Sequence, residues 1–110
     1  MAQVVAIVAD LMLGSRVEET LGAAGHEVRR YPALAEAEGL DATDLLVADL
    51  DCENPEALVG LGMPVLGFYQ HTDVATREAA DAAGIDLAVP RSRLMREMPE
   101  LAERLLAEPA

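Results

Sequence analysis

Residues 44–49 have the sequence Asp-Leu-Leu-Val-Ala-Asp, in which four apolar residues are followed by an acid. A second run of this kind, Val4–Ala9, is entirely apolar and ends at Asp10. Short runs rich in Val, Ile and Leu are typical of strands that are covered on both faces, as in a parallel sheet. Both segments are therefore predicted to be buried strands, each followed or closed by a carboxylate.

Segments with strand and helix patterns alternate along the rest of the chain. Further strands are predicted at His26–Tyr31, Pro64–Tyr69 and Ile85–Val89. Helices are predicted around Val17–Ala24, at Ala33–Glu38, as a short turn at Asn54–Val59, at Asp73–Ala83, and from Pro99 onward. The longer helices have apolar residues three or four positions apart, and capping residues or glycines stand at their ends.

The order of these elements is a strand followed by a helix, repeated five times. Such alternation, with nearly continuous apolar strands, predicts an α/β fold in which helices cover both faces of a parallel sheet. Because crossovers between parallel strands are right-handed, few topologies remain. We expect a three-layer (βα)5 sandwich of the flavodoxin-like type, with strand order 2-1-3-4-5, and a single domain over residues 1–110.

The chain is strongly acidic, with a net charge of -12, and its positive side chains are all arginine. This charge argues against binding to nucleic acid or to an anionic membrane surface, and it favours a basic partner or a divalent cation. No signal peptide is apparent, and no apolar stretch approaches the roughly 20 residues of a membrane span. Together with a single cysteine, Cys52, these features predict a cytoplasmic protein.

At least two carboxylates are expected to meet at one edge of the sheet, and there are three candidates. Asp10 follows the first strand, Asp49 ends the third, and Asp51 comes two residues later. For this strand order the functional crevice lies between strands 1 and 3, at their carboxyl ends. Paired carboxylates suit a hard cation such as Mg²⁺. The structural alternatives are that Asp10 begins a loop and that Asp51 caps the following turn.

Three segments carry a resemblance to a known family. They are Asp44–Asp49, the run Pro64-Val65-Leu66, and Ala79–Asp86. In their order and spacing, the chain resembles a response-regulator receiver (CheY-like) domain over nearly its whole length. The resemblance implies a two-component signalling module that is not an enzyme. Its partner would be a sensor kinase, a signalling effector or a second copy of the chain.

The resemblance also implies roles for individual residues. Asp49 takes the phosphoacceptor position, and Asp10 takes one of the two acidic positions that help to hold Mg²⁺. Tyr69 stands where a receiver has a small hydroxyl residue that contacts the phosphoryl group, and Arg91 stands where it has a lysine. Ala9 replaces the second acid of the pair. These departures predict a degenerate, or pseudo-receiver, variant.

A partner surface is predicted by the same resemblance, on the face formed by the last strand and the last helix. The candidate residues are Tyr69, Leu87, Arg91, Leu94 and Met95. The alternative is that Leu94 and Met95 are ordinary core residues. Nearer the acidic edge, His71 is expected to be an exposed loop residue. Cys52 is expected to be a passive thiol, because neighbouring acids disfavour its thiolate.

Three functions remain open from the sequence. The leading hypothesis is a stand-alone receiver-like module that acts by protein–protein interaction, with altered phosphoacceptor chemistry. The second is an active receiver that is phosphorylated at Asp49 with Mg²⁺. The third is a flavodoxin-like domain that binds a small molecule in the same crevice, although the first strand is not followed by a glycine-rich loop.

Overall fold

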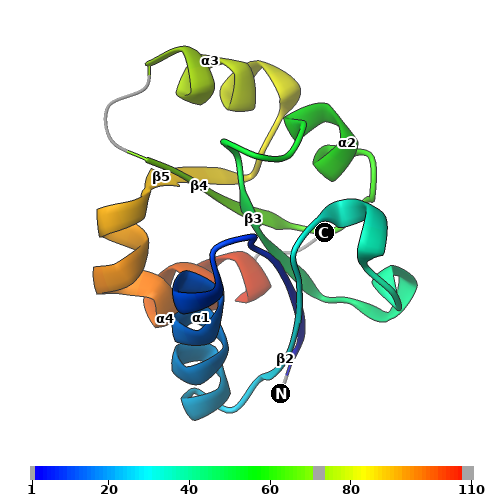
Figure 1. Cartoon of the computed structure of the whole chain (residues 1–110), viewed down its shortest axis with the longest axis vertical. Helices are drawn as coiled ribbons and strands as arrows, with labels where there is room; N and C mark the ends of the chain where they lie inside the picture. The colour runs from blue at the N-terminus through cyan, green and yellow to red at the C-terminus, as the bar shows by residue number, and fades with distance from the viewer. Residues whose placement is uncertain (1, 71–73, 108–110) are drawn as a thin grey trace.

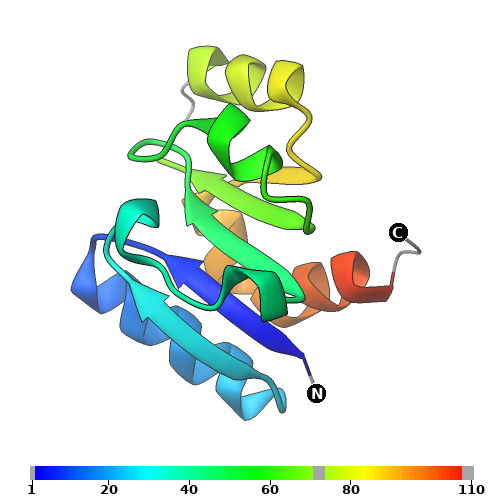
Figure 2. The same ribbon diagram turned by 90° about the vertical axis from the view of Figure 1, so that its right-hand side faces the viewer.

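Five parallel strands form one sheet in the order β2-β1-β3-β4-β5, which confirms the predicted topology (Figure 1). The structure is a computed structural model that describes residues 2–70 and 74–107. In sheet order the strands are Glu27–Tyr31 (β2), Gln3–Ile7 (β1), Leu45–Asp49 (β3), Val65–Tyr69 (β4) and Leu87–Pro90 (β5). Figure 2 shows the same strands from the side, with helices on either face of the sheet.

Helices cover both faces of this sheet, as a three-layer fold requires. One face carries α1 (Leu11–Ala23) and α4 (Arg91–Ala107), and the other carries α2 (Pro55–Val59) and α3 (Val74–Ala83). Two 3₁₀ turns, η1 (Leu34–Glu36) and η2 (Leu40–Ala42), lie on the face of α2 and α3. No helix in the described part of the chain is long and apolar enough to cross a membrane.

The central strands are apolar except at Gln3 and Asp49, at two of their ends, because both of their faces are buried. In β1, Val4 packs with the side chains of α1 and α4, whereas Val5 packs with those of α2 and α3. In β3, Leu45 and Leu46 divide between the two faces in the same way. This arrangement explains why residues 45–48 alternate in direction but not in polarity.

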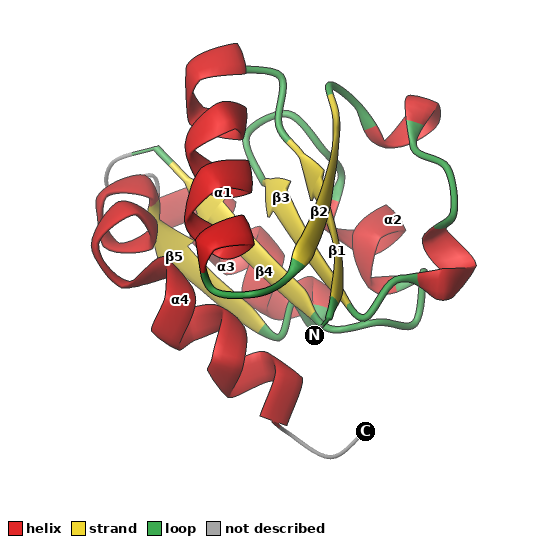
Figure 3. Cartoon of the chain, turned by 90° about the horizontal axis from the view of Figure 1, so that it is seen from below, coloured by secondary structure: helices red, strands yellow, loops and turns green. Residues whose placement is uncertain are grey.

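The second crossover differs from the prediction. The helix expected at Ala33–Glu38 is absent, and the two 3₁₀ turns stand in its place (Figure 3). A six-residue segment is too short to be stable as a helix by its own propensity. The guanidinium of Arg29 instead donates to the carbonyl oxygens of Glu38 and Gly39, each at 3.2 Å, and holds this segment in an irregular path.

Two predicted helix starts were also wrong. Helix α1 begins at Leu11, well before Val17, because Asp10 serves as its N-cap. Helix α4 begins at Arg91 and not at Pro99. It bends at Glu97, which has a φ of -124° and a ψ of 17°, so Pro99 begins only the second segment. The predicted N-cap Asp73 lies outside the described residues.

Gly67, in the centre of β4, leaves space for the side chain of Leu50. A Cβ atom at position 67 would lie 2.7 Å from Cδ1 of Leu50, which is itself buried. We therefore expect Gly67→Ala to lower the free energy of unfolding by about 1–3 kcal/mol, as overpacking does in other cores. Urea unfolding monitored by circular dichroism measures the change.

A matched control is Gly22→Ala in α1, where a new Cβ meets no atom within 4 Å. That substitution should raise the free energy of unfolding by up to about 1 kcal/mol, because alanine favours helix. Leu50→Ala should cost less in the Gly67→Ala background than in the wild type, since there it also removes the overlapping atoms. Equal effects of the two glycine substitutions would contradict the steric explanation.

Candidate functional site

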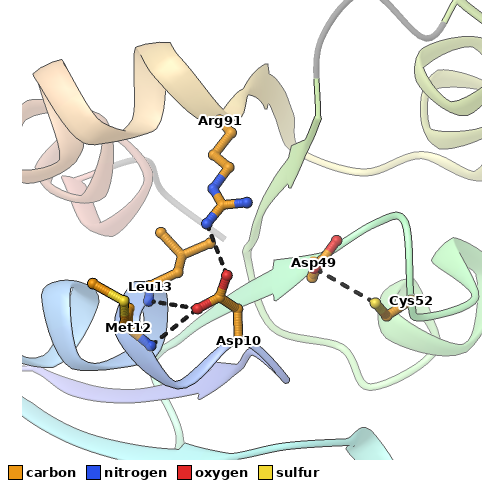
Figure 4. Close-up of polar contacts among 6 residues, drawn as sticks. All are labelled: Asp10, Met12, Leu13, Asp49, Cys52 and Arg91. Carbon is orange, nitrogen blue, oxygen red and sulfur yellow. Dashed lines mark hydrogen bonds and ion pairs between the residues drawn. The ribbon is translucent and has the colours of Figure 1, made fainter.

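A small acidic cavity lies at the carboxyl edge of the sheet, between the ends of β1 and β3. Its volume is about 280 Å³. The residues that line it are Ala9, Asp10, Asp49, Asp51, Cys52, Phe68, Gln70 and Arg91. The structure thus brings together the candidate acids Asp10, Asp49 and Asp51 with Arg91, the arginine that follows β5. Figure 4 shows two of these acids, Asp10 and Asp49, together with Arg91.

Asp10 uses both of its carboxylate oxygens. Oδ1 accepts hydrogen bonds from the backbone N–H groups of Met12 at 3.0 Å and Leu13 at 3.1 Å, which caps α1. Oδ2 accepts a hydrogen bond from Nη2 of Arg91 at 3.0 Å. The bond from Leu13, and then the bond from Arg91, lower the pKa of Asp10 below its ordinary value.

Arg91 joins two ends of the chain that are 81 residues apart in sequence. It is the first residue of α4, directly after β5, and its side chain reaches across the cavity to Asp10 (Figure 4). Asp49, on the other side of this cavity, has partners from its own loop. The positive charge of Arg91 is therefore paired with Asp10 and not with Asp49.

Asp49 and Asp51 organise the loop that follows β3. Oδ1 of Asp49 accepts a hydrogen bond from the backbone N–H of Asp51 at 2.9 Å, and Oδ2 lies 3.6 Å from Sγ of Cys52. Oδ2 of Asp51 accepts a hydrogen bond from the backbone N–H of Gln70 at 2.8 Å. Asp51 therefore ties its loop to the end of β4 and does not cap α2, whose N-cap is Asn54.

Gln70 also lines the cavity at this edge, although it was not among the site residues predicted from the sequence. Its position directly after β4 was the available signal, because residues that follow parallel strands converge on the same edge. Cys52 agrees with the expected passive thiol. Partial burial raises the pKa of Cys52 first, and the nearby charge of Asp49 raises it further.

Two of the predicted surface residues lie in the core. Tyr69 is only 4% exposed and packs among the residues under α2 and α3, and it does not line the cavity. Leu94 is fully buried on the inner face of α4. The prediction that Tyr69 and Leu94 contact a partner is therefore wrong. The other three predicted residues, Leu87, Arg91 and Met95, are partly exposed. His71 lies outside the described residues.

Neither a protein-family model nor a curated protein matches the chain, but solved structures do. The HemR receiver domain of Leptospira biflexa is 22% identical, with a TM-score of 0.83, and the match covers 100% of this chain and 98% of that one. The chain has the receiver fold. CheY4 of Vibrio cholerae (19% identity, TM-score 0.78) matches over 96% of this chain and 98% of its own. A putative response regulator of Chloroflexus aurantiacus (19% identity, TM-score 0.83) matches over 97% of this chain and 98% of its own.

The receiver fold implies a Mg²⁺ site at this edge, and the residues present do not fit one. Within residues 2–70 and 74–107, no group of three His, Cys, Asp or Glu side chains could hold a metal ion. Asp10, Asp49 and Asp51 line the cavity, but each carboxylate is held by a backbone N–H, and Asp10 also by Arg91. The predicted trio is therefore not arranged as a ligand set.

The ion pair of Asp10 should make stability depend on pH. The pKa of Asp10 is lower in the folded than in the unfolded chain, so its charge stabilises the fold above the ordinary value of 3.8. This contribution is lost as the pH falls through the folded pKa. We expect Asp10→Asn, which keeps a capping oxygen, to lower the urea midpoint at neutral pH and to lower it progressively less as the pH falls below 3.8.

Asp41→Asn provides a charge-matched control, because Asp41 is exposed in η2. It should change the urea midpoint less than Asp10→Asn does at neutral pH. An effect of Asp10→Asn that stays the same as the pH falls below 3.8 would show that the charge of Asp10 contributes nothing to the fold.

Proposed function

We propose that this chain is a receiver-like signalling module that acts through contact with a partner protein, without enzymatic activity of its own and without phosphoryl transfer to Asp49. The receiver fold supports the signalling class. The observation that carries the proposal is the partner of Arg91, which is Asp10 at 3.0 Å. The group that would stabilise a phosphoryl group on Asp49 is thus already engaged.

The electrostatics of phosphoryl transfer explain why this matters. A phosphoryl group carries roughly -1.5 to -2 charges at neutral pH, and its transfer depends on positioned cations and hydrogen-bond donors. Tyr69, at the hydroxyl position, has its side chain in the core. Ala9 offers no carboxylate for a metal ion, and Arg91 faces Asp10. Asp49 thus keeps the acceptor position without the usual helpers.

Partner contact is supported by apolar side chains exposed at the same edge of the sheet. Leu11 is 77% exposed and Met12 is 85% exposed, and both lie in the first turn of α1 beside Asp10. Val74, at the start of α3, is 62% exposed. Because the chain carries a net charge of -12, the partner that fits this edge presents apolar side chains flanked by arginine or lysine.

An active phosphoacceptor is the second candidate. It is favoured by the presence of Asp10, Asp49 and Arg91 around one cavity. It requires Arg91 to leave Asp10 and turn toward Asp49. A small-molecule site is less well supported, because a cavity of about 280 Å³ lies at the lower end of the size range of ligand pockets and three carboxylates line it.

Mass spectrometry after incubation with acetyl phosphate and Mg²⁺ separates the first two candidates. We expect no gain of one phosphoryl mass, because among the described residues that line the cavity the positive side chain, Arg91, is paired with Asp10 and not with Asp49. A receiver domain of known activity, treated in the same tube, shows that the phosphodonor is competent. A phosphoryl adduct on the wild-type chain that disappears in Asp49→Asn would establish the active receiver instead.

The exposed pair Leu11 and Met12 should not be needed for folding. We expect the double substitution Leu11→Ser with Met12→Ser to change the free energy of unfolding by no more than about 0.5 kcal/mol, because both side chains are largely in water. Leu13→Ala, in the same turn but buried, should cost about 2–5 kcal/mol. Urea unfolding of the three proteins measures both effects.

A loss of more than about 1 kcal/mol in the double variant would assign the pair to the stability of the fold and remove the main support for a partner surface. Sedimentation equilibrium of the wild type tests whether a second copy of the chain binds at this surface. Self-association that the double variant abolishes would identify the partner as a second copy of the chain.

A further inference from the structure

We infer that Arg91 is the resident cation of the acidic cavity and that it takes the place of Mg²⁺ there. This inference rests on the proposed function and names the feature that keeps the site inactive. It starts from the misfit between the ligand set implied by the receiver fold and the side chains present. The structure replaces a metal–carboxylate site with a guanidinium–carboxylate pair.

Both carboxylate oxygens of Asp10 already have partners in the protein. Oδ1 is held by the backbone N–H groups of Met12 and Leu13, so the carboxylate is fixed by the start of α1. Oδ2 is bound to Arg91 at 3.0 Å. Three of the roughly four lone-pair sites of the carboxylate are therefore occupied. A metal ion at the remaining site, on Oδ2, would lie beside the guanidinium, whose like charge repels it.

The cavity also offers too few carboxylate ligands that face one point for Mg²⁺. Mg²⁺ requires nearly octahedral oxygen coordination and loses its water reluctantly, so it needs carboxylates that face one point. Ala9 lines the cavity where a second acid would be needed. Asp51 is turned to the backbone of Gln70 at 2.8 Å, and Asp49 to the backbone of Asp51 at 2.9 Å. The remaining acids are therefore oriented by the protein for other partners.

The negative charges of the three acids in the cavity are compensated by Arg91. Like charges that lie close together destabilise a site unless a cation compensates them. Arg91 supplies this positive charge from the first turn of α4, and it is always protonated. Its charge is present at any Mg²⁺ concentration. The cavity therefore has a fixed counter-ion that links the start of α1 to the start of α4.

Titration with MgCl₂ tests this directly, with backbone amide shifts followed by NMR and the ionic strength kept constant with NaCl. We expect the wild-type chain to show no saturable shift at Ala9, Asp10 or Asp49. The double variant Ala9→Asp with Arg91→Gln should show saturable shifts at these residues, with an apparent affinity at least about ten-fold higher. Arg91→Gln removes the guanidinium, and Ala9→Asp supplies the missing ligand at a position that already faces the cavity.

Arg93→Gln is the matched control, because Arg93 lies two residues further along α4 and pairs with Glu97 at 3.4 Å. Like the wild type, it should bind no Mg²⁺. Saturable shifts of the wild type at low millimolar Mg²⁺ would overturn the inference, and this result needs no variant. A folded double variant that takes up no more Mg²⁺ than the wild type would also overturn it.

These outcomes are separate from those of the phosphorylation test. Mg²⁺ binding by the wild type without a phosphoryl adduct would overturn the role of Arg91 while the proposed function stands. A phosphoryl adduct on Asp49 would overturn the proposed function itself, whatever the Mg²⁺ titration shows.

Discussion

In the middle of the sheet, β1 and β3 pack apolar side chains against helices on both faces, and this burial determines where polar chemistry can lie. No buried polar or charged residue is found in the core of the described residues. Polar groups that follow these strands are therefore confined to the sheet edges. At the carboxyl edge, the strand order places β1 beside β3, so Asp10 and Asp49 end up around one cavity.

Asp10 shows how one residue can serve the fold and the site together. Its carboxylate caps α1 through two backbone N–H groups and pairs with Arg91 at the start of α4. The capping bonds depend only on a residue with a side-chain oxygen at the N-cap. The ion pair depends on the crossover that brings β5 and α4 to the same edge. Local structure thus acts on Oδ1 and long-range structure on Oδ2 of one carboxylate, which fixes the orientation of the acid.

The topology could be predicted from the sequence because the signal is repeated in the three central strands, β1, β3 and β4. The apolar runs of β1, β3 and β4 leave no polar face, and this specifies a parallel sheet with two helical layers. The irregular path of the second crossover was not predicted, because its alanine-rich segment has helical propensity. Its path is set by Arg29 of β2. The start of α4 was missed because the pattern at Pro99 marks only the bend.

The site was predictable in its location but not in its contacts. Converging strand ends place Asp10, Asp49, Asp51 and Arg91 together, but they do not determine which acid forms the ion pair with Arg91. The pairing with Asp10 follows from side-chain reach and from the cap that holds Asp10. Among acids that repel one another, a protein-borne guanidinium and a divalent ion serve the same electrostatic need, so an arginine turned to Asp10 and an alanine at position 9 are mutually consistent. A partner that contacts Leu11 and Met12 touches the very turn whose cap is bound to Arg91, and for this reason binding at α1 is physically connected to the position of α4.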